Sequence, residues 1–182
     1  MNITDISVER WLQIRLFVLD FDGILNDGYV YICETGLETN RFSHLDGKGV
    51  DHLLAAGIIV HVLSGQVNKI VETRCRKLTI TWDSGRALKS AEGKLAGFGR
   101  ILLRHGLQFD ESLYMGDDVN DLLVLQRAGI GITVPNGHPL VLQECPWVTV
   151  ARGGHGAVRE VVDQLLLVRS MMESEIKKEE VS

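Results

Sequence analysis

The chain has 182 residues, of which 45% are hydrophobic and 24% are charged, and its formal net charge is −5. This length and composition are typical of one globular domain that can bury a sizeable hydrophobic core. Because no basic patch balances the acids, the composition disfavours nucleic acid and anionic membrane surfaces as partners.

The cysteines and the apolar segments exclude further classes of protein. The three cysteines are widely spaced and form no C-x-x-C pair, so the sequence predicts neither a disulfide framework nor a zinc site. They are Cys33, Cys75 and Cys145. The early residues include acids, and no apolar stretch reaches the roughly 18 residues of a membrane span. We therefore expect a cytoplasmic protein without a signal peptide or membrane helix.

The first elements lead to a pair of aspartates. Residues 1–13 are expected to form a short lead-in helix or an N-terminal arm ahead of the first strand. The apolar run that begins at Phe17 then predicts a buried strand, and it stops at Asp20 and Asp22. Gly23 and the Asn-Asp-Gly of residues 26–28 are typical of a turn after that strand. The first strand therefore ends in carboxylates.

The next residues predict a hairpin. Residues 29–32 and 37–44 are two extended segments around a glycine-containing turn, so we expect a β-hairpin that projects from the end of the first strand. A purely structural flap is as compatible with this pattern as a functional one.

The remainder of the chain alternates between helices and strands. Predicted helices cover residues 46–56, 66–77, 88–105, 118–128, 139–144 and 156–175, and predicted strands cover residues 58–63, 78–82, 112–115, 130–134 and 147–150. Such alternation predicts a parallel sheet with helices on both faces. We expect an α/β fold, a Rossmann-like doubly wound parallel sheet, over residues 14–172, with a charged tail at residues 173–182.

Polar side chains follow four of the predicted strands. They are Asp20 and Asp22, Ser64 together with the backbone amide of Gly65, Lys89, and Asp117 with Asp118 and Asp121. The carboxyl ends of parallel strands open on the groove where ligands bind, so these groups are expected to share one site. Carboxylates from different strands repel one another by about 1–4 kcal/mol at ~4 Å, and they therefore need a cation between them.

The residue types indicate which ligands this site would hold. Hard oxygen ligands suit Mg²⁺. A hydroxyl, a backbone amide and a lysine ammonium are groups that bind the oxygens of a phosphoryl group. The four strand ends together therefore predict a phosphoryl-transfer site.

Each group also has a plain structural interpretation. Residues 116–121 could be an acidic helix start, Ser64 a helix cap and Lys89 a solvated lysine. An EF-hand loop is excluded because Ile24 stands two residues after Asp22, and a dinucleotide-binding loop is excluded because no G-x-G-x-x-G follows the first strand. The occurrence of four such strand ends in this order favours phosphoryl transfer.

Four segments resemble the motifs of the haloacid dehalogenase superfamily of phosphohydrolases: DFDGILNDG, LSG, GRALK and GDDVND. With the hairpin, the HLDGKGV segment and the ARGGHGAVRE segment, residues 15–168 are similar to a small capless branch of that superfamily. This branch includes phosphatases of 3-deoxy-D-manno-octulosonate (KDO) 8-phosphate, phosphatases of nonulosonate 9-phosphates, and phosphatase-like domains of some sialic acid cytidylyltransferases.

The resemblance implies a role for each motif residue. Asp20 would be the nucleophile that becomes an aspartyl phosphate, and Asp22 would protonate the departing sugar oxygen and later deprotonate water. Mg²⁺ would be held by Asp20, Asp117 and the backbone carbonyl of Asp22. Asp118 and Asp121 would either support these ligands or orient Lys89. The groups that would bind the phosphoryl oxygens are Ser64, Gly65 and Lys89.

The spacing of the motifs leaves no room for a lid domain. One hairpin and one helix fill the interval from Asp22 to Ser64, and one helix and one strand fill that from Lys89 to Asp117. An open site would control water poorly, so another subunit is expected to cover it, with the hairpin as the contacting flap. The branch is typically tetrameric, which implies a homotetramer.

The substrate is less firmly indicated. The residue after the Ser64-Gly65 pair is usually Arg in the KDO 8-phosphate enzymes and Glu in the 9-phosphate enzymes, whereas this chain has Gln66. Leu45 stands where the former commonly have Arg, and Asn26 where most relatives have Thr. These departures leave the sugar open.

Three further residues complete the candidate substrate-binding set. Arg74 and Lys77 lie three apart on one helix face and match positions through which a neighbouring subunit reaches the sugar acid, although an exposed basic face is an equally good interpretation. His44 is isolated and is interpreted as a structural or rim residue.

The leading hypothesis is a Mg²⁺-dependent phosphatase that acts on a sugar-acid phosphate, with KDO 8-phosphate as substrate. A nonulosonate 9-phosphate phosphatase is the alternative enzyme. An inactive oligomerisation domain of a sugar-nucleotide pathway is the alternative outside catalysis, and the presence of every catalytic motif residue argues against it.

Overall fold

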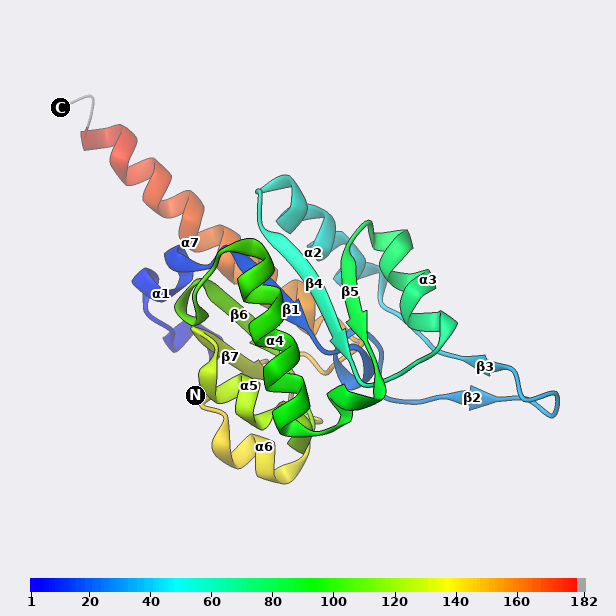
Figure 1. The fold of residues 1–182 in the computed structure, drawn as a ribbon. Helices are drawn as coiled ribbons and strands as arrows, with labels where there is room; N and C mark the ends of the chain where they lie inside the picture. The colour runs from blue at the N-terminus through cyan, green and yellow to red at the C-terminus, as the bar shows by residue number, and fades with distance from the viewer. Residues whose placement is uncertain (180–182) are drawn as a thin grey trace.

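The computed structural model describes residues 1–179 and has a six-stranded parallel sheet with helices on both faces (Figure 1). The strands are β1 (Leu16–Leu19), β4 (Ile59–Ser64), β5 (Thr81–Ser84), β6 (Ser112–Met115), β7 (Ile130–Thr133) and β8 (Trp147–Val148), in the spatial order β5-β4-β1-β6-β7-β8. This confirms the predicted α/β doubly wound architecture.

The strand order decides where a ligand can bind. From β1 the chain builds the sheet outward through β4 and β5, and it then crosses back to place β6 on the other side of β1. Open parallel sheets bind ligands outside the carboxyl ends of the strands at such a reversal. The loops that follow β1 and β6 therefore lie at the expected position of a site.

Alternating side chains of the strands enter two separate cores. On β1, Phe17 and Leu19 join one core and Leu16 and Val18 join the other, as the two-residue period of a strand requires. The first core lies under α1 (Val8–Gln13), α2 (His44–Ala55), α3 (Lys69–Leu78) and α7 (Ala157–Glu179). The second lies under α4 (Ala91–His105), α5 (Leu122–Arg127) and α6 (Pro139–Glu144).

The N-terminal segment contains the short helix that was one of the two forms expected for it, whereas the C-terminal helix is longer than predicted. The N-terminal segment is packed into the first core through Ile3, Ile6 and Trp11, so it is part of the domain body. Helix α7 continues to Glu179, beyond the predicted end at residue 175, and its last turns extend away from the body (Figure 1). Glu and Lys are good helix formers, so charged residues can extend an exposed helix. Residues 180–182 of the predicted tail lie outside the described residues.

The predicted hairpin is present and projects from the body (Figure 1). Its paired strands, β2 (Tyr31–Ile32) and β3 (Glu38–Thr39), are shorter than the predicted segments. Within the described residues, the connections between strands contain this hairpin and the helices given above but no cap domain. Among those residues, no helix combines the length and the apolar character needed to cross a membrane.

The start of α4 is the most consequential boundary difference. The sequence predicted a helix from residue 88, but Ser90 caps the helix by accepting a hydrogen bond from the backbone N–H of Gly93 (3.1 Å). Residues Arg86–Lys89 form a separate 3₁₀ turn. A serine cap fixes the first turn of a helix, and Lys94 therefore lies in that turn.

One buried histidine lies at the β5 side of the sheet. His61 on β4 is fully buried, with Nδ1 2.7 Å from the hydroxyl of Thr81 and Nε2 3.5 Å from the carboxylate of Asp83, which also pairs with Arg104. Burial lowers the pKa of His61 to about 4, although the Asp83 carboxylate opposes this shift. The folded protein therefore holds this imidazole neutral.

This gives a testable pH dependence of stability. An unfolded histidine takes up a proton below a pKa of roughly 6.5, whereas folded His61 does so only near 4, so folding stability falls as the pH drops through this window. We expect wild-type protein to lose about 2 kcal/mol more unfolding free energy than His61→Asn between about pH 7.5 and about pH 5. Urea unfolding at the two pH values measures the difference, and equal losses in the two proteins would contradict it.

Candidate active site

Three carboxylates meet at the carboxyl ends of β1 and β6. Asp20 follows β1 directly, Asp117 lies just beyond β6, and Asp121 ends the 3₁₀ turn Val119–Asp121. One carboxylate oxygen from each residue lies within 4.8 Å of the other two. The structure therefore brings Asp20 and Asp117 together, as the strand-end pattern predicted.

A glycine makes this approach possible. Gly23 has φ +75°, and a Cβ atom at this position would lie 2.0 Å from Oδ2 of Asp117. The Asp117 carboxylate thus occupies the space that any other side chain at position 23 would fill. The absence of a side chain at Gly23 therefore lets the Asp117 carboxylate lie directly against the turn after β1.

A buried lysine holds the acids together. Lys94 on α4 is 0% exposed, and its Nζ lies 3.0 Å from Oδ2 of Asp20 and 2.6 Å from Oδ1 of Asp121. Burial lowers the pKa of Lys94, but the two carboxylates more than offset that effect, so the pKa is raised and the ammonium stays charged. Lys94 therefore fixes the position of the Asp20 carboxylate.

Asp121 has its acceptor positions filled by protein groups. Oδ2 accepts hydrogen bonds from the backbone N–H groups of Asp117 and Asp118 (3.1 Å each). Oδ1 accepts one from the hydroxyl of Tyr114 and pairs with Lys94. Because its oxygens already have these partners, Asp121 orients the neighbouring groups of the site, whereas Asp20 and Asp117 are the candidate ligands of a cation.

The electrostatics of the cluster favour a bound cation. Burial raises the pKa of Asp117 to about 7, and the carboxylates of Asp121 and Asp118 add to this shift. Burial also raises the pKa of Asp20, which is 7% exposed, against the opposing effect of Lys94. A divalent cation among these oxygens would favour their ionised forms, and the hard oxygen donors fit Mg²⁺.

The groups predicted to bind a phosphoryl group line the same cavity of 380 Å³ as Asp20, Asp22 and Asp117. They are Ser64, Gly65 and Lys89. Gln66, a candidate substrate-binding residue, also lines this cavity. Ser64 is buried, and its Oγ accepts a hydrogen bond from the backbone N–H of Gln66 (3.1 Å), which leaves the hydroxyl proton available for a ligand. Lys89 is exposed at the rim beside Gly65.

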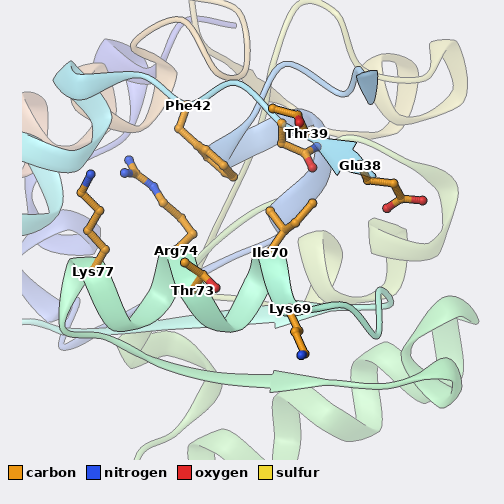
Figure 2. Close-up of a pocket in the computed structure, with 9 residues that line it drawn as sticks. Glu38, Thr39, Phe42, Lys69, Ile70, Thr73, Arg74 and Lys77 are labelled. Carbon is orange, nitrogen blue, oxygen red and sulfur yellow. The ribbon is translucent and has the colours of Figure 1, made fainter. Parts of the chain in front are cut away.

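Three predicted substrate-binding residues lie outside this cavity. Arg74 and Lys77 line a separate cavity of 340 Å³ between α3 and the base of the hairpin (Figure 2). The guanidinium of Arg74 stacks on the ring of Phe42 at 4.9 Å and donates a hydrogen bond to the backbone carbonyl of Ser43 (3.2 Å). His44 is exposed at the start of α2 and lines neither cavity.

Comparison with known proteins shows what this arrangement is similar to. Residues 65–161 match the family described as haloacid dehalogenase-like hydrolase. The chain is 36% identical over 161 residues to the KDO 8-phosphate phosphatase of Escherichia coli K12, which covers 88% of this chain and 84% of that protein. The chain belongs to the haloacid dehalogenase-like hydrolase family.

Solved structures of similar hydrolases share the whole fold. The KDO 8-phosphate phosphatase of Yersinia pestis superposes with a TM-score of 0.84 at 34% identity, over 91% of this chain and 88% of that one. The enzyme of Moraxella catarrhalis, in complex with a magnesium ion, a phosphate ion and a KDO molecule, gives a TM-score of 0.84 at 32% identity, over 94% of this chain and 96% of that one.

Lys94 of this haloacid dehalogenase-like hydrolase was not among the site residues predicted from the sequence. The lysine role was assigned to Lys89, the lysine of the GRALK segment that follows the predicted strand at residues 78–82. The structure places the ammonium of Lys94, and not that of Lys89, against Asp20. A usable signal was present, since residues 94, 98 and 101 share one face of a helix and Phe98 and Ile101 are core residues. A lysine on an apolar face needs a buried anionic partner.

Replacing each lysine tests this assignment. Lys94→Met leaves two buried carboxylates without their cation, so we expect the unfolding free energy to fall by about 3–5 kcal/mol at neutral pH. The matched control Lys89→Met removes an exposed lysine, and we expect a change within about 0.5 kcal/mol. Urea unfolding of both variants without added metal decides the point, and a Lys94→Met protein as stable as wild type would refute it.

Proposed function

We propose that this chain is a Mg²⁺-dependent phosphatase that hydrolyses a sugar-acid phosphate through an aspartyl-phosphate intermediate, with KDO 8-phosphate as its substrate. The single observation that supports this most is the Asp20 carboxylate, held 3.0 Å from the ammonium of Lys94 in a cavity also lined by Ser64 and Asp117. The relatives named for KDO 8-phosphate phosphatase cover nearly the whole chain, which favours this substrate.

Two residues carry the proposed bond changes. An oxygen of Asp20 attacks phosphorus as the bond from phosphorus to the sugar oxygen breaks, and Asp22 gives that oxygen its proton. Asp22 then takes a proton from water, whose oxygen bonds to phosphorus as the bond to Asp20 breaks. The products are the free sugar acid and inorganic phosphate, and both aspartates return to their starting states.

The remaining groups neutralise charge and bind the phosphoryl oxygens. An anionic nucleophile is repelled by a phosphate dianion until cations offset the repulsion. Lys94 supplies one such charge at Asp20. Mg²⁺, held by Asp20, Asp117 and the backbone carbonyl of Asp22, would supply the other as a Lewis acid. Ser64, the Gly65 amide and Lys89 are assigned to the phosphoryl oxygens.

We also propose that a second copy of the chain covers the site, in a homotetramer located in the cytoplasm. The projecting hairpin supports this, because four large side chains on it are at least 60% exposed: Tyr29, Tyr31, Ile32 and Leu37. Exposed apolar residues on one projecting element are typical of a protein–protein interface. The second cavity would then meet the substrate bound to a neighbouring copy, with Lys77 beside its carboxylate.

Phosphate release from purified protein tests the proposed reaction. We expect turnover of KDO 8-phosphate with added Mg²⁺, loss of turnover with EDTA, and a fall of at least about 10⁴-fold in kcat for Asp20→Asn, which lacks the nucleophile. A nonulosonate 9-phosphate assayed in parallel identifies the alternative substrate. Failure of wild-type protein to release phosphate from either sugar phosphate would overturn the proposal.

Mixed oligomers test whether Lys77 acts on a neighbour's site. Asp20→Asn alone should be inactive, and Lys77→Met alone should show a KM raised by about 10-fold, the effect of losing one charge-assisted contact. Coexpression of the two variants should create sites that combine intact Asp20 with a neighbour's intact Lys77, so a fraction of the activity should regain the wild-type KM. A mixture with only the raised KM would show that Lys77 does not act between copies.

A further inference from the structure

The loop between β1 and the hairpin contains a buried asparagine beside the proposed acid. The Asn26 side chain is fully buried. Its Oδ1 accepts hydrogen bonds from the backbone N–H of Gly23 (3.0 Å) and of Gly28 (2.9 Å), and its Nδ2 donates one to Oδ1 of Asp22 (2.8 Å). This one side chain therefore connects both ends of the turn to Asp22.

The partners fix which way the amide points. A backbone N–H can only donate, so the oxygen of Asn26 must face Gly23 and Gly28. The NH₂ group is then left facing the carboxylate of Asp22. The buried amide cannot turn over without placing its NH₂ against two N–H groups, so the hydrogen bond to Asp22 is locked by the turn itself.

This contact distinguishes the two oxygens of Asp22. Oδ1 is held by Asn26, while among the described residues no hydrogen bond engages Oδ2. Asp22 lines the catalytic cavity together with Lys94 and Asp117. The free oxygen is therefore the one that can carry a proton toward a ligand in that cavity.

We propose, on the basis of the phosphatase function proposed above, that Asn26 is a positioning residue that holds Asp22 so that Oδ2 delivers the proton to the departing sugar oxygen. Asn26 makes no bond to the substrate. It also pairs through its backbone with Phe42 at the base of the hairpin, so the same residue joins the proposed acid to the flap that a second copy would contact.

A comparison of two leaving groups tests this role. The alkoxide of a sugar needs a proton as it departs, whereas p-nitrophenolate leaves as a stable anion, so only the sugar phosphate depends on Asp22 in the first step. The value of kcat/KM covers substrate binding and the first step, but not the later hydrolysis of the aspartyl phosphate. For Asn26→Asp, which keeps the size and both acceptor bonds but replaces the donor by a charge, we expect kcat/KM for KDO 8-phosphate to fall by about 10- to 100-fold. For p-nitrophenyl phosphate we expect a fall of less than about threefold.

Matched variants separate positioning from other effects. Asn68→Asp makes the same change at the cap of α3, where the side chain accepts from the backbone N–H of Val71 and Asp caps equally well, so both substrates should change by one common factor. Asn26→Thr places a hydroxyl group at this position, which can donate a hydrogen bond to Asp22. Its kcat/KM for KDO 8-phosphate should therefore fall less than that of Asn26→Asp. If thermal melting shows that Asn26→Asp does not fold, Asn26→Ala is judged by the same ratio.

Several results would overturn the assignment. An equal fall on both substrates in Asn26→Asp, or no fall on either, would show that Asn26 does not act through the proton of Asp22. An equally selective loss in Asn26→Thr would show that the donated hydrogen bond is not the cause. Wild-type protein that hydrolyses neither compound would instead reject the phosphatase function, so the two failures are distinguishable.

Discussion

The ion pairs of Lys94 with Asp20 and Asp121 are the constraint around which the site is built. A lysine that is 0% exposed is compatible with folding only because carboxylates surround it, and the buried Asp20 depends equally on the lysine. The cluster joins β1, the turn after β6 and the first turn of α4, which lie far apart in the sequence. The fold is therefore held together at the same place where the proposed chemistry occurs, and the proposed nucleophile keeps a fixed position before any ligand binds.

The two cavities divide the proposed work between recognition and chemistry. The cavity at the strand ends gathers the aspartates, the serine and both lysines, whereas the cavity under the hairpin gathers Arg74 and Lys77 (Figure 2). Arg74 has a defined structural task, because its guanidinium packs on Phe42 and holds the backbone that enters α2. Lys77 has an exposed ammonium on the same rim and is the better candidate for contact with a neighbour's ligand.

The turn after β1 shows how one short segment can serve several purposes. Gly23 leaves room for Asp117, Asn26 closes the turn by hydrogen bonding, and the same amide reaches Asp22. The next residues lead into the hairpin, whose apolar side chains are exposed. The backbone of Asn26 pairs with Phe42 at the hairpin base and its side chain bonds to Asp22, so one residue links the hairpin to the site.

The sequence by itself determined the α/β architecture and the convergence of Asp20, Asp22, Ser64 and Asp117, because strand alternation and the grouping of parallel strand ends are set by local patterns. Only the tertiary structure decided which lysine joins Asp20, since a lysine becomes an ion-pair partner only when its helix packs beside the acids. The role of Asn26 was likewise invisible in the sequence. Its three hydrogen bonds exist only after the turn has closed, and the residue type alone does not indicate which atoms an amide will meet.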